Sequence, residues 1–104
     1  MVIGYAQEPT RNDSVEVGTT STVICEPRNS QNERTVLLIR NISPNAADEI
    51  TINVGFGEAI ANKGIVLKQS ESFAESREAG YKVFQGSISA ICATANGVLS
   101  IHER

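Results

Sequence analysis

The sequence predicts an all-β fold, a single antiparallel β-sandwich or small barrel of seven or eight short strands. From Thr20 onward, short runs of Val, Ile, Leu, Thr and Phe alternate with clusters of Gly, Asn, Pro and Ser. No stretch carries the 3.6-residue apolar period of a long helix. A chain of 104 residues supports one core. We therefore expect a β-domain over residues 20–104, preceded by a polar, extended N-terminal arm over residues 1–19.

The first three strands are predicted at residues 21–26, 34–42 and 50–56. STVICE ends at Pro27, and RTVLLIRNI is apolar at four consecutive positions, as expected in the middle of a packed sheet. The third strand has the period of two that is typical of a half-buried strand. Its core face is predicted to carry Ile50, Ile52, Val54 and Phe56.

Further strands are predicted at residues 64–67, 72–75 and 98–103, and within a long run, 81–95, that Gly86 is expected to bend or divide. The pair Asn96-Gly97 is the strongest hairpin signal in the chain, because both residues tolerate the positive φ of a two-residue turn. ESFAESREAGYK is the one stretch that is open to a helical reading, and its apolar spacing is poor.

The glycines at 55, 57 and 64 raise the question of a phosphate-binding loop. A P-loop needs GxxxxGK[ST] at the start of a helix. Here the spacing differs, Lys63 precedes the last glycine, and the β run GIVL follows. We predict a strand, a loop and a second strand, with glycines at the tight backbone positions.

Composition argues against several classes of function. The net charge is -3 and the basic residues are scattered, so nucleic acid is not an expected partner. No apolar run approaches a membrane span, and no export signal is recognised. His102 is the single histidine and is predicted to face solvent, opposite Leu99 and Ile101. No metal-ligand spacing occurs, so we expect no cofactor, no metal and no enzymatic activity.

The two cysteines, Cys25 and Cys92, lie in apolar strand-like runs without CxxC spacing. We interpret them as buried, reduced thiols. A bridge between an early and a late strand is the alternative.

From Arg34 to Arg104 the order of motifs resembles a group of small β-sandwich proteins of tailed phages. The pattern is "RN.S", a strand that runs into a glycine, "G..L...ESF", "G.I.AI" and a terminal "L.I.E". It is carried here by Arg40, Asn41, Ser43, Gly57, Gly64, Leu67, Glu71, Ser72, Phe73, Gly86, Ile88, Ala90, Ile91, Leu99, Ile101 and Glu103. The resemblance implies a jelly-roll-like virion protein of the capsid decoration (cementing) type. Such a protein is made in the host cytoplasm and binds the major capsid protein on the capsid surface as a homotrimer.

An interface is expected on three segments that sequence alone predicts to be exposed: the arm, the loop after the second strand, and the loop at 58–63. The candidate interface residues are Tyr5, Arg11, Pro44, Asn45, Glu58, Asn62 and Lys63. Three other functions stay open. They are a head–tail or tail component, a carbohydrate- or ligand-binding module, and an enzyme built around a carboxylate of perturbed pKa.

Overall fold

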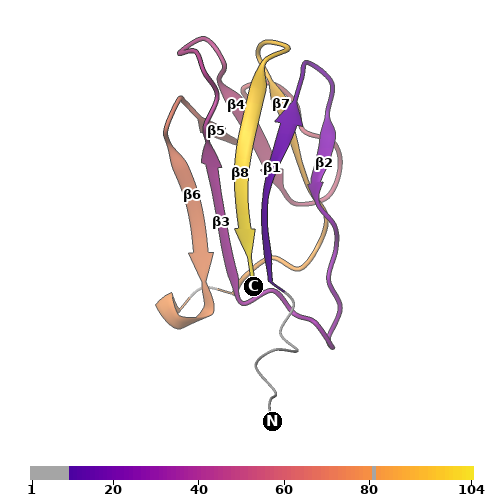
Figure 1. Ribbon diagram of the computed structural model, residues 1–104. Helices are drawn as coiled ribbons and strands as arrows, with labels where there is room; N and C mark the ends of the chain where they lie inside the picture. The colour runs from indigo at the N-terminus through magenta and orange to yellow at the C-terminus, as the bar shows by residue number, and fades with distance from the viewer. Residues whose placement is uncertain (1–9, 81) are drawn as a thin grey trace.

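The computed structural model describes residues 10–80 and 82–104, which form two four-stranded antiparallel sheets packed on one another (Figure 1). The strands are β1 (Arg11–Val17), β2 (Thr22–Cys25), β3 (Val36–Asn41), β4 (Ile50–Val54), β5 (Ile65–Leu67), β6 (Ser72–Ser76), β7 (Ile88–Cys92) and β8 (Gly97–Glu103). The prediction of an all-β sandwich of about eight strands is confirmed. Within the described ranges, no helix is long and apolar enough to cross a membrane.

Strand order distinguishes the two sheets. Sheet A has the order β1-β8-β3-β6 and sheet B the order β2-β7-β4-β5. Of the pairs of strands that follow one another in sequence, β4 and β5 alone pair in one sheet. Every other connection carries the chain from one sheet to the other, so the core is enclosed between layers that interleave along the sequence.

The core lies between the two sheets and is built by alternate residues of each strand. In β8, Leu99 and Ile101 are buried, while His102 lies on the opposite face as predicted. In β3 the alternation also holds, because Leu37 and Ile39 are buried and Leu38 is exposed. The buried cluster comprises Val17, Ile24, Cys25, Leu37, Ile39, Ile50, Ile52, Leu67, Val83, Ile88, Ala90, Cys92, Leu99 and Ile101.

The first strand begins earlier than the sequence predicted. Residues 11–17, which we assigned to the arm, form β1 and pair with β8 from Arg11 opposite Glu103 to Val17 opposite Gly97. The prediction that the sandwich starts at Thr20 is therefore wrong. Among the inward-facing side chains of β1, only those at the end of the strand, such as Val17, are apolar. The sequence therefore shows no apolar period of two over most of this strand. The remaining arm residues, 1–9 with Tyr5, lie outside the described residues.

The third predicted strand is shorter than expected. β4 ends at Val54, and Phe56, predicted to face the core, is 96% exposed. The Asn53 side-chain amide donates to the carbonyls of Phe56 and Gly57 at 3.2 and 3.1 Å. Those bonds turn the backbone out of the strand, so the period of two stops before Phe56.

The turn at Asn96-Gly97 does not join a hairpin, because β7 belongs to sheet B and β8 to sheet A. Gly97 has no positive φ. It is required for another reason: a Cβ there would lie 2.6 Å from the carbonyl oxygen of Val17 and 2.7 Å from Cys92 Sγ. The prediction of a hairpin is wrong, since a glycine needed for close packing looks the same in sequence as one needed for a turn.

The long run 81–95 is only partly a strand. β7 (Ile88–Cys92) begins just after Gly86, and the described residues before it, 82–87, form no strand. The stretch that was open to a helical reading forms β6 followed by a single 3-10 turn, Arg77–Ala79. Gly80 ends this turn in the left-handed region, with φ of 89°.

Candidate functional site

The loop between β4 and β5, residues 55–64, lies across the outer face of sheet B. The Ser89 hydroxyl donates to the Gly57 carbonyl at 3.4 Å, and the Ala59 amide donates to Ser21 Oγ at 2.9 Å. The loop then returns to β4, where the Asn62 amide donates to Thr51 Oγ1 at 2.9 Å. These bonds fix the loop on the sheet and bury two side chains of its outer face, Thr51 and Ser89.

This loop carries the largest exposed apolar side chain of the described residues. Phe56 is 96% exposed and Ile60 is 55% exposed. One edge of Phe56 is supported by a T-shaped contact with Phe84, with ring centroids 6.3 Å apart. A shallow hollow of about 200 Å³ adjoins the two residues and is also lined by Asn53, Glu58 and Lys63. The loop is therefore fixed on the sheet and exposes two apolar side chains, Phe56 and Ile60.

The predicted interface residues do not form one surface. Glu58, Asn62 and Lys63 are all exposed on the loop 55–64. Pro44 and Asn45 are exposed too, but they belong to the β3–β4 connection, whose contacts are with the start of β8 and with the loop before it. Two separate candidate surfaces result, and the loop 55–64 is the larger apolar one.

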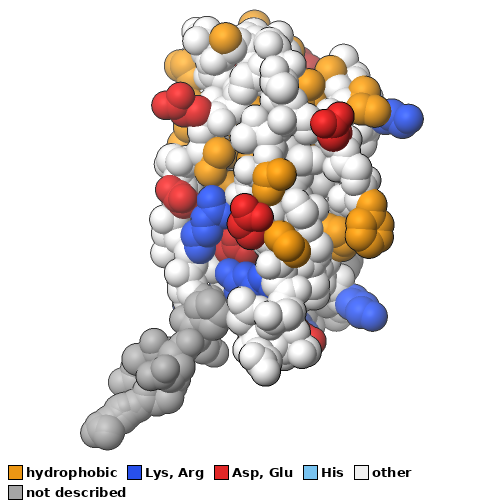
Figure 2. Space-filling view, turned by 90° about the vertical axis from the view of Figure 1, so that its right-hand side faces the viewer, with side chains coloured by type: hydrophobic (Ala, Val, Ile, Leu, Met, Phe, Trp, Pro, Cys, Tyr) orange, Lys and Arg blue, Asp and Glu red, His pale blue; other side chains and the backbone are white. Residues whose placement is uncertain are grey.

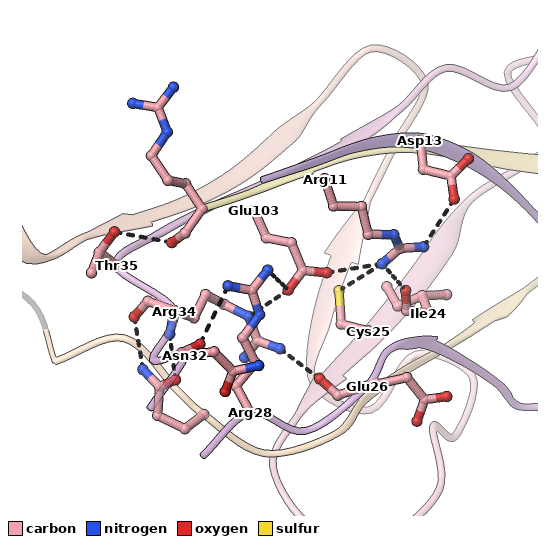
Figure 3. Close-up of polar contacts among 12 residues, drawn as sticks. Arg11, Asp13, Ile24, Cys25, Glu26, Arg28, Asn32, Arg34, Thr35 and Glu103 are labelled. Carbon is pink, nitrogen blue, oxygen red and sulfur yellow. Dashed lines mark hydrogen bonds and ion pairs between the residues drawn. The ribbon is translucent and has the colours of Figure 1, made fainter. Parts of the chain in front are cut away.

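Arg11, the last candidate of the described chain, contributes to a buried ion cluster that we define as Arg11, Arg28, Arg34 and Glu103 (Figure 3). Glu103 Oε1 accepts from Arg34 Nε at 2.9 Å and lies 3.1 Å from Arg28 Nη2. Its Oε2 accepts from Arg11 Nη1 at 2.9 Å. The Glu103 side chain is only 3% exposed, so both oxygens are occupied by guanidinium groups inside the fold.

Arg34 is the most deeply buried member of the cluster, with a side chain that is 0% exposed. Its guanidinium donates to the carbonyls of Glu26, at 2.9 Å, and Phe84. The backbone of Arg34 is also held, because Gln85 accepts from its amide at 2.6 Å and donates to its carbonyl at 2.7 Å. The cluster thereby fixes the segment before β7, which is not itself a strand.

The same cluster joins the two sheets. Arg11 lies on β1 of sheet A, yet its Nη1 also donates to the Ile24 carbonyl of β2 in sheet B, at 2.7 Å. Both strands are edge strands. Arg11 therefore closes one side of the sandwich by satisfying a carbonyl of an unpaired sheet edge.

The electrostatics of the cluster favour its charged state. Burial by itself would raise the pKa of Glu103, but the hydrogen bonds from Arg11 and Arg34 and the charges of Arg34 and Arg28 outweigh it and lower the pKa. Burial by itself would likewise lower the pKa of Arg11, and the hydrogen bond to Glu103 raises it instead. Glu103 is thus held as a carboxylate, which is the opposite of what a general acid needs.

The cysteines are both free and buried, as predicted. Cys25 lies beside the ion cluster, with its sulfur 3.9 Å from Arg11 Nη1. Burial, followed by the negative charge of Glu103, raises the pKa of this thiol to about 12. It therefore stays protonated at neutral pH and is a poor nucleophile.

At the other end of the sandwich lies a second buried polar group, the Asn41 network, defined as Asn41, Ser43, Asp48 and Thr94. Asn41 Nδ2 donates to the carbonyls of Asp48 and Leu67 at 2.8 and 2.9 Å. Asn41 Oδ1 accepts from the Ser43 amide at 3.0 Å. The Thr94 hydroxyl donates to Asp48 Oδ1 at 2.5 Å. The network ties the end of β3 to the start of β4 and the end of β5.

The ion cluster was not recognised from the sequence, although a signal was present. The period of two that places Leu99 and Ile101 in the core also places Glu103 there. A buried carboxylate needs a charged partner, so the pattern indicated that an arginine or a lysine lies beside Glu103 in the fold. The choice of Arg34, 69 residues away, depended on the fold and was not readable from the sequence.

No group of His, Cys, Asp and Glu side chains within residues 10–80 and 82–104 is arranged to hold a metal ion. Comparison of the chain with protein-family models, with curated proteins and with solved structures found no match.

Proposed function

We propose that this chain is a non-enzymatic structural protein that binds its partner through the loop 55–64. The observation that carries the proposal is the combination of full exposure and rigid support at Phe56. Large aromatic side chains are enriched at the centres of protein interfaces because they bury much apolar surface at little entropic cost. The side-chain amide of Asn53 fixes the backbone at Phe56 and Gly57, so the ring of Phe56 is held in one exposed position.

Within this class, we propose a capsid decoration protein of a tailed phage that binds the major capsid protein as a homotrimer. The strand orders β1-β8-β3-β6 and β2-β7-β4-β5 support the jelly-roll part of this proposal, since a jelly roll is a double sheet of eight strands. Repeated weak contacts on a lattice are sufficient for such a protein, because avidity replaces strong single-site affinity.

Several residues of the motifs that carry the phage resemblance also stabilise the fold of this chain. Asn41 of "RN.S" centres one buried network, and Glu103 of "L.I.E" centres the other. Gly86 of "G.I.AI" is packed against Phe84, and a Cβ at this position would overlap the ring. These residues support the resemblance as one of architecture.

A carbohydrate-binding module is the second candidate, and Phe56 favours it too. An exposed ring beside a hollow with the polar side chains of Asn53, Glu58 and Lys63 is suited to stacking on a sugar. The two candidates share a surface and differ in what covers it.

The test is binding to empty, expanded heads of the tailed phage whose genome encodes the chain, measured by co-sedimentation, with the mass in solution measured by light scattering. We expect a trimer, or a monomer that is retained by heads. Phe56→Ser should weaken retention at least tenfold with unchanged thermal stability, because the side chain is 96% exposed. Leu38→Ser, which removes an exposed apolar side chain from sheet A, is the matched control.

Deletion of residues 1–9 tests the role of these residues while leaving β1 in place. Deletion of residues 1–19 would also remove β1. A monomer that ignores heads but is retained on a polysaccharide column through Phe56 would overturn the decoration proposal in favour of the carbohydrate module. Retention that is insensitive to Phe56→Ser would show that the loop is not the interface.

A further inference from the structure

The ion cluster borders an open pocket that is separate from the loop 55–64. The pocket has a volume of about 300 Å³, at the lower end of the range for small-ligand sites. Figure 2, which views the side of the molecule where β1 and β2 lie in Figure 1, shows basic and acidic side chains together in the lower half of this face, with hydrophobic side chains beside them. The residues that matter for the pocket's chemistry are Arg11, Val23, Glu26, Pro27, Arg28 and Asn32.

Hydrogen-bond donors on the pocket wall are only partly used. The Arg28 side chain is 10% exposed, and its Nη2 is bound to Glu103, whereas its Nη1 reaches the Asn32 carbonyl only at 3.5 Å. Arg11 Nη2 has one long contact, 3.4 Å to Asp13. Asn32 Oδ1 is occupied by the Asn29 amide at 2.9 Å, which leaves the Asn32 Nδ2 group to donate to a ligand.

The charges of the cluster do not balance. Its three guanidinium groups face the carboxylate of Glu103, and Asp13 adds a second, half-exposed carboxylate beside Arg11. One positive charge is left over. A third acid, Glu26, lines the pocket, but its carboxylate points away from the guanidinium groups in Figure 3, and its carbonyl is the group that accepts from Arg34.

We propose that this pocket binds one carboxylate group of a small molecule or peptide end, held by Arg28, Arg11 and Asn32. A guanidinium already fixed by a buried carboxylate is preorganised, so little side-chain entropy is lost when the ligand binds. Val23 is 52% exposed and, with Pro27, provides an apolar wall for the carbon next to the carboxylate. The site is independent of the interface proposed for Phe56.

The charge of the site selects a monoanion. A carboxylate supplies the single negative charge that the cluster lacks, and its two oxygens match the parallel N–H groups of a guanidinium. A phosphate dianion would bring a second negative charge, beyond the one that the cluster lacks, toward Glu103 on the same pocket. We therefore expect discrimination against phosphate.

The experiment is a titration of the full chain with N-acetylglycine at constant ionic strength, followed by ¹H–¹⁵N NMR that includes the arginine Nε–H signals. Saturable shifts are expected at Arg28, Arg11 and Asn32. The uncharged N-acetylglycinamide, the matched ligand control, should produce none of them. Inorganic phosphate should bind at least tenfold more weakly.

Two variants assign the site. Asn32→Asp keeps the oxygen that accepts from Asn29 and replaces the Nδ2 donor with a negative oxygen, and Arg28→Gln removes the principal cation. Each should weaken N-acetylglycine binding at least tenfold, whereas Asn45→Asp, which adds the same charge in the β3–β4 connection, should leave it unchanged. If the NMR spectrum shows that Arg28→Gln is unfolded, the result for Asn32→Asp alone decides the test.

Three outcomes would overturn the proposal. The absence of saturable shifts at concentrations that fill a millimolar site would show that the pocket binds no carboxylate. Phosphate binding that equals or exceeds that of N-acetylglycine would show that the site is not selective for carboxylates. Unchanged binding in Asn32→Asp would place the ligand elsewhere.

Discussion

The two ends of the sandwich are both closed by buried polar side chains, but one end is centred on the carboxylate of Glu103 and the other on the uncharged amide of Asn41. The ion cluster sets three guanidinium groups around Glu103, with oxygen–nitrogen distances of 2.9 to 3.1 Å. The Asn41 network relies on an uncharged amide that bonds to two carbonyls and one backbone amide. Both connect sheet A with sheet B. The Asn41 network also holds the carboxyl of Asp48, which accepts from the Thr94 hydroxyl and the Asn45 amide, so the two ends differ in whether the central group is charged.

Charge raises the cost of losing a partner. A buried ion needs compensation for its desolvation, and each member of the ion cluster depends on the others for it. The side chain of Asn41 leaves behind neutral groups when it is removed, and each of these costs less. The difference predicts unequal sensitivity to substitution at the two ends.

The largest effect is expected for Glu103→Gln. The neutral amide leaves Arg34, whose side chain is 0% exposed, without its counter-charge. Loss of one partner from a buried ion pair costs about 3 to 5 kcal/mol of unfolding free energy. Urea unfolding followed by circular dichroism measures this, with Glu16→Gln on the exposed face of β1 as the control. A loss below 1 kcal/mol would show that the cluster is hydrated and not a buried ion pair.

An intermediate effect is expected for Asn41→Ala. The substitution leaves the carbonyls of Asp48 and Leu67 and the amide of Ser43 without this partner. We expect a loss on the order of 2 to 3 kcal/mol, because unsatisfied buried groups cost about 1 kcal/mol or more each. Asn45→Ala, exposed in the adjoining connection, should change stability by less than about 0.5 kcal/mol. A loss for Asn41→Ala as large as that for Glu103→Gln would remove the distinction between the two ends.

The two ends also differ in how far the sequence revealed them. Strand patterns were readable because apolar alternation is local: Leu99 and Ile101 reveal β8 whatever lies across from them. β1 escaped recognition because Arg11 faces inward in place of an apolar residue, and its partner Glu103 is 92 residues away. Asn41 was singled out only as part of a motif, since its bonding partners lie in two separate segments, the β3–β4 connection and β5.

The candidate surfaces were likewise predictable only in part. Exposed loops were predicted at 58–63 and after β3, since polar and glycine-rich segments between strands lie on the surface. Phe56 was placed in the core by its alternation with Ile50, Ile52 and Val54. The break came from Asn53, whose amide bonds to the Phe56 and Gly57 carbonyls. Such a side-chain bond to the backbone has no periodic signature in the sequence.

The smallest expected effect is the change of stability with pH, and it is also the one most specific to the charge of Glu103. Because the pKa of Glu103 is lower in the folded state than in the unfolded chain, its contribution to stability is complete above the unfolded pKa of about 4.3 and is lost as the pH falls through the folded pKa. The urea midpoint should therefore receive a constant contribution from Glu103 between about pH 5 and 7, and lose it at lower pH.

The pH dependence of the urea midpoint should differ between a substitution at Asn41 and one at Glu103. Asn41→Ala should retain the acid loss that Glu103 causes, displaced downward at every pH, because Asn41 carries no titrating group. Glu103→Gln should be less stable at pH 7 and should approach the wild type as the acid removes the wild type's advantage, since Gln resembles the protonated acid. Curves for the wild type and Glu103→Gln that run parallel down to pH 2 would show that the charge of Glu103 does not stabilise the fold, and the two ends would then differ in composition alone.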